Sequence, residues 1–210
     1  MKITIIGATG FVGSALLSEA LSRGHEVTAI VRDGSRVPAG PAVKEIDASD
    51  AASLEPALQG QDAVISAFNG GWGDPDIYAK HSRGSAAIAA AAGKAGTRLI
   101  VVGGAGSLYA PDGSQFVDSD AFPKEWKDGA RAARDHLAEL KKSTGLDWTF
   151  VSPPFELAPG ERKGTYRVAG DTPVFDENGK SAISVADLAV AILDEAEKPA
   201  HRRARFTVGY

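Results

Sequence analysis

Short runs of consecutive apolar residues, most of them β-branched, alternate along the chain with longer stretches in which apolar residues return every three or four positions. Continuous apolar runs are typical of strands that are covered on both faces. The wider spacing is typical of helices that bury one side. The pattern therefore predicts strands at residues 2–6, 26–31, 42–46, 63–66, 98–102 and 147–152, with helices at 12–23, 51–58, 77–95 and 125–143 between them.

This alternation predicts the fold class. Parallel strands that are joined through helices take right-handed crossovers, and helices then cover both faces of the sheet. After residue 153 Gly and Pro become frequent, and the expected elements are short strands at 165–168 and 173–175, a helix at 185–197 capped by Ser184, and a strand at 205–208. We expect an α/β protein with a Rossmann-type, doubly wound parallel sheet. Residues 1–210 form a single domain in this interpretation, with 153–210 as a small substrate-covering lobe that is not independent.

Composition and charge disfavour several classes of protein. The 210 residues are 43% hydrophobic and 24% charged, which is ordinary for a soluble globular protein. A net charge of −4 without a basic tract argues against a nucleic-acid partner, and the apolar runs are too short to predict a membrane partner. The absence of cysteine removes disulfides, thiolate metal sites and cysteine nucleophiles, and it favours a cytoplasmic location.

Two further chemistries are also disfavoured. The four histidines are scattered without the spacing of metal ligands, so no metal site is expected. The G-x-S-x-G elbow of α/β-hydrolases does not occur. His136 lies on the helix expected at 125–143, and there we expect a solvated side chain rather than a catalytic one.

Glycine recurs at every third residue, as Gly7, Gly10 and Gly13, directly after the first strand and at the start of the first helix. Gly7 permits a tight turn, Gly10 lets backbone amides approach a pyrophosphate, and Gly13 lets the helix pack closely. The unpaired amides and the dipole of a helix N-terminus favour an anion here. We therefore predict a dinucleotide-binding turn, with a ligand-free glycine-rich turn as the alternative. The same segment contains Thr9, Phe11 and Val12.

This G-x-x-G-x-x-G spacing, with the matching segments 27–33, 62–65, 146–150 and 183–189, resembles the extended and atypical short-chain dehydrogenase/reductases. Within that superfamily, segments 101–108 and 158–162 make the chain most similar to the small NAD(P)H-binding, NmrA-like branch, whose members are commonly described as NADH-flavin reductases. The resemblance extends over the full chain and implies a nicotinamide cofactor.

The end of the second strand bears on the choice of nicotinamide. An NAD enzyme places a carboxylate there to bind the ribose hydroxyls, whereas this strand ends Ile30-Val31-Arg32. A guanidinium can pair bidentately with the 2′-phosphate of NADPH, so Arg32 predicts that NADPH is preferred and leaves NADH possible. The alternative is a plain surface arginine. Asp33, which follows, could face away or weaken the preference.

Other cofactor contacts are implied by the resemblance. Asp47 and Ala48, after the third strand, match the position that contacts the adenine, although Asp47 could instead cap the helix near Ala51. The remaining cofactor contacts that the resemblance implies are Ala67, Phe68, Asn69, Gly103 and Pro153.

The acceptor side is expected beyond the fifth strand. Ser107 falls near the family's catalytic serine, where it could hydrogen-bond a substrate carbonyl or simply cap a turn. Trp72 could stack on a substrate or anchor its own loop, and Pro153 and Phe155 could wall the nicotinamide or begin a rigid loop. The expected substrate contacts are Phe68, Trp72, Ser107, Tyr109 and Phe155.

The Tyr-x-x-x-Lys pair of standard short-chain dehydrogenases is missing, because Ala130 and Arg134 stand near its expected positions. Without this proton relay, alcohol dehydrogenase and sugar epimerase activities are disfavoured. Two functions remain: an NADPH-dependent oxidoreductase that transfers hydride to a flavin, quinone or similar small-molecule acceptor, and a non-catalytic NADP(H)-sensing regulatory protein. We expect a monomer or homodimer.

Overall fold

The computed structural model describes all residues, 1–210. Its strands are β1 (Lys2–Ile6), β2 (Glu26–Val31), β3 (Ala42–Glu45), β4 (Ala63–Ser66), β5 (Arg98–Val102), β6 (Trp148–Ser152), β7 (Glu156–Ala158), β8 (Arg167–Ala169), β9 (Ala182–Ser184) and β10 (Ala204–Gly209). Eight of them form one sheet in the order β3-β2-β1-β4-β5-β6-β10-β8, and β7 pairs with β9 in a second, two-stranded sheet. All pairs are parallel except β10 with β8, so the doubly wound Rossmann-type sheet is confirmed.

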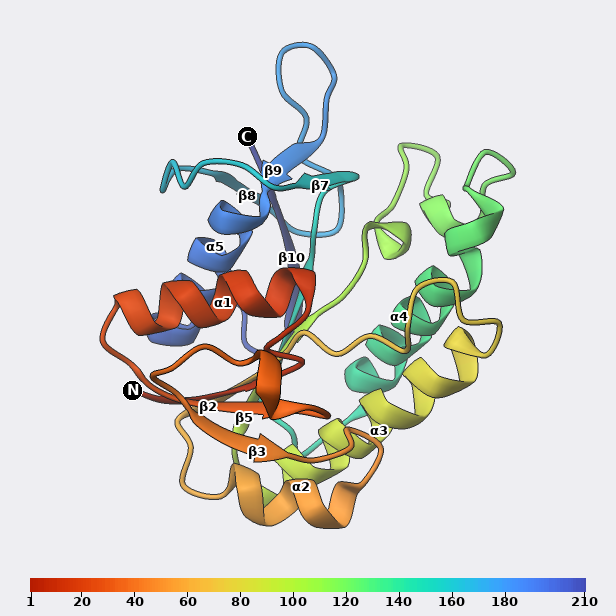
Figure 1. Cartoon of the computed structure of the whole chain (residues 1–210). Coiled ribbons are helices and arrows are strands. Elements are labelled where there is room, and N and C mark those ends of the chain that lie inside the picture. The colour runs from red at the N-terminus through yellow and green to blue at the C-terminus, as the bar shows by residue number, and fades with distance from the viewer.

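Helices cover both faces of the large sheet (Figure 1). The α-helices are α1 (Phe11–Ser22), α2 (Ala51–Leu58), α3 (Ile77–Ala95), α4 (Lys124–Lys142) and α5 (Val185–Glu197). Helices α1 and α5 pack together on one face, where residues such as Leu16 and Ile192 share a core with Ile3. On the other face α2, α3 and α4 enclose a second core that includes Leu54, Ile88 and Trp148. None of the helices is long and apolar enough to cross a membrane.

The sequence-based elements of the main sheet are found within a residue or two of their expected bounds, and Ser184 caps α5 by accepting from the amide of Asp187 at 3.0 Å. Residues 173–175 were expected to be a strand, and this expectation is wrong. Pro173 has no amide to offer a ladder, and Val174 packs instead over Gly209 at the end of β10. The short strands β7 and β9 were not expected, because three residues are too few to show a period.

Residues 153–210 contribute a strand to the main sheet and a helix to the layer that covers one of its faces. Strand β10 extends the main sheet beside β6, and α5 covers it together with α1. Only β7, β9 and the loops around them form a separate small layer above the main sheet (Figure 1).

The six strands β1 to β6 are mutually parallel, so the turns that follow them gather at one edge of the sheet. The chain order reverses between β1 and β4, and ligands of open α/β sheets bind at such a switch point, outside the carboxyl ends of the strands. Two short 3₁₀ turns, η2 (Ala105–Ser107) and η3 (Phe116–Asp118), lie in the connection that follows β5.

Candidate functional site

The turn between β1 and α1 is built on backbone that tolerates no side chain at two of its glycines. Gly7 has a φ of +80°, and a Cβ there would lie 2.8 Å from the carbonyl oxygen of Ala67. A Cβ on Gly13 would lie 2.0 Å from the carbonyl oxygen of Gly7. The first helical turn therefore sits directly on the turn that precedes it, as the glycine spacing predicts.

The N-terminus of α1 is left open to a ligand. Gly10 is its N-cap, no side chain caps the helix and its first turn carries no acidic residue. The first helical amide to find a partner is that of Ser14, which donates to Gly10 at 2.9 Å. A Cβ at Gly10 would meet only the carbonyl oxygen of Gly7, at 3.3 Å. These unpaired amides fit an anion such as a pyrophosphate.

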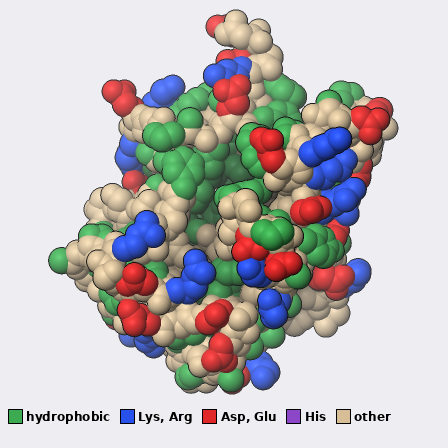
Figure 2. Space-filling model, turned by 45° about the vertical axis from the view of Figure 1, so that its right-hand side comes forward, with side chains coloured by type: hydrophobic (Ala, Val, Ile, Leu, Met, Phe, Trp, Pro, Cys, Tyr) green, Lys and Arg blue, Asp and Glu red, His purple; other side chains and the backbone are tan.

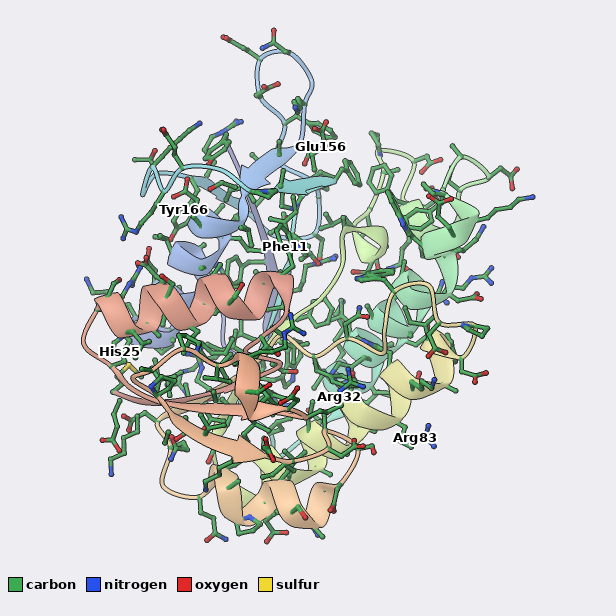
Figure 3. All side chains as sticks on the ribbon, viewed as in Figure 1. Phe11, His25, Arg32, Arg83, Glu156 and Tyr166 are labelled. Atoms are coloured by element: carbon green, nitrogen blue, oxygen red, sulfur yellow. The ribbon has the colours of Figure 1, made fainter.

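Three neighbours of these amides are placed differently. Thr9 and Val12 are half-buried, and Val12 packs against the core shared by α1 and α5. Phe11 is 50% exposed at the end of α1 that meets the sheet edge (Figure 3).

A second group of charged residues gathers beyond β2 and β3. Arg32 follows β2 directly, Asp47 follows β3 by two residues, and Arg83 lies on α3, which packs beside α2. Asp47 accepts from the amide and the hydroxyl of Ser49, both at 2.8 Å. These bonds, aided by the positive charges of Arg32 and Arg83, hold the pKa of the Asp47 carboxyl below its usual value.

Both arginines of this group are exposed, and their guanidinium groups are free (Figure 3). The arginine ion pairs of the structure involve Arg23, Arg98, Arg134, Arg162, Arg202 and Arg205. Arg32 and Arg83 are near enough to Asp47 for their charge to lower its pKa, and an arginine without an ion pair is available to bind a phosphate. Sequence reasoning missed Arg83, which lies in the middle of a helix with no motif around it.

The neighbouring acids have defined local roles. Asp33 accepts from the amide of Ser35 at 2.9 Å and so caps the short turn that follows β2. Asp50, rather than Asp47, caps α2, since it accepts from the amides of Ala52 and Ser53. The alternative role of Asp47 as that helix cap is therefore wrong. Ala48, beside it, is buried.

The residues that follow β4 lie between the turn after β1 and helix α3. Ala67 donates to Ile6 at 2.9 Å, and its carbonyl faces Gly7. The Phe68 ring packs against α3, where it stacks on His81 with centroids 5.8 Å apart and leaves no room for a Cβ at Gly84. Asn69 accepts from the amide of Gly71 at 2.7 Å. Phe68 thus lies between the sheet edge and α3.

Gly103 and Pro153 directly follow β5 and β6, which are adjacent in the sheet. The amide of Gly103 donates to Val151 at 2.9 Å, and a Cβ there would lie 1.9 Å from the Phe150 ring. Packing against this ring is a sufficient reason for glycine at the position. Pro153 follows β6 directly and is half-buried.

The hydroxyl of Ser107 is enclosed by protein. Ser107 is 2% exposed and donates to the carbonyl of Gly104 at 3.3 Å. It also accepts from the buried guanidinium of Arg205 at 3.2 Å, which is held in turn by Asp171. This geometry matches the turn-capping alternative and favours it over the predicted contact between Ser107 and an acceptor.

Helix α4 offers no proton relay on the side that faces η2. Ala130 packs there against Gly106, where a Cβ would lie 3.2 Å from the Ala130 methyl carbon. Arg134 pairs instead with Asp118 and Asp135, each at 2.9 Å. His136 was expected to be solvated, and this is wrong: it is 8% exposed. Its burial between α3 and α4 lowers its pKa to about 4, so the ring is neutral at pH 7.

The acceptor contacts expected from the sequence are more open. Trp72 is 61% exposed, with one side of its ring over Gly129 of α4. Tyr109 is half-buried, and Phe155 is 42% exposed. Figure 2 shows a hollow near the centre of the surface in that view, with hydrophobic side chains along part of its border. A groove of about 480 Å³ lies elsewhere, between α3 and α4, with Tyr78, Ala86 and Leu140 in its walls.

Comparisons with known proteins agree with this geometry. The family model described as NAD(P)H-binding matches residues 7–196. An uncharacterized Bacillus subtilis protein, YwnB, is 40% identical over 99% of this chain and 98% of its own length. Among the solved structures that cover 100% of the chain are a Bacteroides thetaiotaomicron protein provisionally named as an epimerase (42% identity, TM-score 0.93, 96% of that chain) and a Streptococcus pneumoniae protein provisionally named as an NADH-flavin reductase (38% identity, TM-score 0.88, 99% of that chain).

The chain therefore belongs to the NAD(P)H-binding family, as its resemblance to the atypical short-chain dehydrogenase/reductases implies.

Proposed function

We propose that this member of the NAD(P)H-binding family is an NADPH-dependent reductase that transfers hydride to a flavin, quinone or similar small conjugated acceptor. Two features carry the proposal. The first is an open site for a cofactor at the sheet edge, around β1, α1 and β2, which we call the cradle. The second is the neighbouring face of α4, which has no acid–base pair. Such a site can hold a nicotinamide, but it has no group to relay a proton to an alkoxide.

In the proposed complex the dinucleotide would lie along the carboxyl edge of the sheet. The amides at the start of α1 would bind the pyrophosphate, and Asp47 and Ala48 would lie against the adenosine. Arg32 and Arg83 would bind the 2′-phosphate between them, which favours NADPH over NADH. Gly103 and Pro153 end adjacent strands, where they would border the nicotinamide.

The acceptor fits the lack of a relay. When bound, NADPH supplies a hydride, which is equivalent to two electrons and one proton. Hydride transfer leaves the reduced flavin or hydroquinone as an anion, which can take its second proton from water. The protein therefore has only to bring the two rings together and exclude competing reactions. The exposed aromatic side chains of Trp72 and Phe155, with half-buried Tyr109, would serve that positioning role.

The test is steady-state oxidation of NADPH, with riboflavin, FMN, menadione and 1,4-benzoquinone as acceptors. We expect turnover with at least one of them, and NADPH affinity above NADH affinity by calorimetry. Tight NADPH binding without turnover on any acceptor would overturn the reductase and support the second candidate, an NADP(H)-sensing protein. The observation that favours this second candidate is the same absence of an acid–base pair on α4.

A further inference from the structure

Three phenylalanine rings that are far apart in the sequence meet above the sheet edge. The rings of Phe116 and Phe155 have centroids 4.7 Å apart at an interplanar angle of 74°. Those of Phe155 and Phe175 are 6.2 Å apart and inclined by 47°. We call this group, Phe116, Phe155 and Phe175, the aromatic wall.

The wall keeps much of its surface in water. Phe155 is 42% exposed, Phe175 is 44% exposed and Phe116 is half-buried. An aromatic ring that stays exposed to water does not gain the free energy of burial. A cluster of exposed rings therefore marks a surface that a ligand or partner covers. None of the three rings belongs to either hydrophobic core of the protein.

The backbone that carries each ring is fixed by a hydrogen bond or by proline. Phe116 lies in η3, and its amide donates to Leu108 at 3.1 Å. Phe155 follows Pro153 and Pro154, whose fixed φ stiffens the chain after β6. The carbonyl of Phe175 accepts from Arg167 at 2.6 Å. A surface that is ordered before binding pays little entropy when a ligand covers it.

The wall adjoins the place proposed for the nicotinamide. Phe155 stands two residues after Pro153, at the carboxyl end of β6. Phe116 follows Gln115, whose amide side chain donates to the carbonyl of Ser107 at 3.0 Å, so this ring is tied to the turn after β5. The wall therefore extends from the ends of β5 and β6, which are adjacent in the sheet.

We infer that the aromatic wall binds the hydride acceptor, and that the acceptor class is a fused, planar ring system of two or three rings rather than a single ring. This inference rests on the proposed reductase function and narrows its substrate class. The three rings are inclined to one another, so a planar acceptor meets them through edge-to-face and tilted contacts. A fused system of two or three rings is long enough to contact more than one of them, whereas a single ring is not.

The direct test measures binding and does not need turnover. Riboflavin, an uncharged three-ring probe, is titrated by its fluorescence into the full chain saturated with NADP⁺. We expect Phe155→Leu and Phe175→Leu each to raise the dissociation constant of riboflavin about three- to tenfold, because each removes one ring contact. Affinity for NADPH should be unchanged in Phe175→Leu, because Phe175 is not among the expected cofactor contacts.

Tyr78→Leu is the matched control, because Tyr78 is also 42% exposed but lies on α3, bonded to Asp135 of α4. It should bind riboflavin like the wild type. Unchanged riboflavin affinity in both Phe variants, or equal weakening in the control, would overturn the inference. So would a wild type that does not bind riboflavin.

A graded activity series separates this inference from the reductase proposal. In Phe175→Leu, kcat/KM should fall most for riboflavin, less for menadione and within twofold for 1,4-benzoquinone. An equal fall in kcat/KM on all three acceptors would overturn the proposed role of the aromatic wall and leave the reductase proposal standing. Riboflavin binding that depends on the wall, without turnover on any acceptor, would retain the wall as a ligand site and remove the reductase.

Discussion

The two halves of the candidate site are built by different means. The cofactor cradle around β1, α1 and β2 is made of backbone: a positive-φ glycine, a glycine that seats the helix and amides without partners. The acceptor side is made of side chains from distant segments, with Phe116, Phe155 and Phe175 as its exposed surface. The cradle tolerates almost no change in shape, whereas the wall can be altered ring by ring, as expected if one half binds an invariant cofactor and the other sets the acceptor.

The largest effect is expected at Gly10, where cradle geometry and fold stability can be separated. Gly10 has a φ of −78°, which any residue adopts, so Gly10→Val should fold. Its side chain would occupy the approach to the pyrophosphate, and NADPH affinity should fall more than about a hundredfold. Calorimetry measures the affinity, and circular dichroism checks the fold. Near-normal affinity would remove the cofactor assignment.

The next effect concerns the two free arginines at the other end of the cradle. Charge-assisted contacts to a phosphate are worth about 1.5–3 kcal/mol each, so Arg32→Ala and Arg83→Ala should each weaken NADPH binding about ten- to a hundredfold. NADH lacks the 2′-phosphate, so its affinity should barely move. Dissociation constants for both cofactors, at one fixed salt concentration, test this expectation.

Equal losses of NADPH and NADH in Arg32→Ala would show that this arginine does not contact the phosphate. An effect of Arg32→Ala without one of Arg83→Ala would limit the phosphate site to the residue that the sequence predicts. Arg36, exposed two residues beyond Gly34, offers a control arginine whose replacement should leave both affinities unchanged.

A smaller effect is expected where a charge network ties α1 of the cradle to the loop after β7. Glu19 on α1 is 6% exposed and accepts from Arg162, in the loop after β7, in two bonds of 2.8 Å. It also pairs with Arg23 at 2.8 Å. The Arg162 and Arg23 guanidinium groups lower the pKa of the Glu19 carboxyl to about 2 against the burial that opposes them.

The sign of the pH dependence follows from this lowered pKa. The stabilising contribution of Glu19 is fully present above the unfolded-state value of 4.5 and is lost as the pH falls through about 2. Glu19→Gln should therefore reduce the free energy of unfolding by roughly 1–3 kcal/mol at pH 7, and the gap to the wild type should narrow below about pH 4. Urea unfolding between pH 3 and 7 measures both. A gap that stays constant over this range would contradict the assignment.

The smallest effect is expected at Ser107, which lies between the two halves. Removal of its hydroxyl breaks the bonds with Gly104 and Arg205, and Ser107→Ala should lose about 0.5–1.5 kcal/mol of stability with kcat/KM within twofold of the wild type. Thermal unfolding and steady-state kinetics on the best acceptor measure the two quantities. A larger fall in kcat/KM at unchanged stability would place the hydroxyl on the acceptor.

Much of the fold could be predicted because its signals are local. The bounds of β1, β2, β4, β5, α2, α3 and α5 coincide with the residues expected from apolar runs and helical periodicity. Buried parallel strands require such runs, and a helix requires its periodic face, so both are written into consecutive residues. The positive φ of Gly7 and the close seating of Gly13 were predictable for the same reason, since the turn joins neighbouring elements.

The remaining features depend on which segments the fold brings together. Arg83 joins Arg32 only because α3 packs beside α2, and Phe175 reaches Phe155 across a loop with no periodic pattern. His136 is different, because it falls on the same face of α4 as Ala133, Leu137 and Leu140. The helical spacing already indicates a buried side chain there, and the expectation of a solvated one misread it. The sequence by itself determined the parallel sheet, its helices and the backbone cradle, which are made by neighbours in the chain. Only the tertiary structure decided the second arginine, the enclosure of Ser107 and the aromatic wall, because each depends on contacts between residues that are distant in sequence, and periodicity carries no information about those.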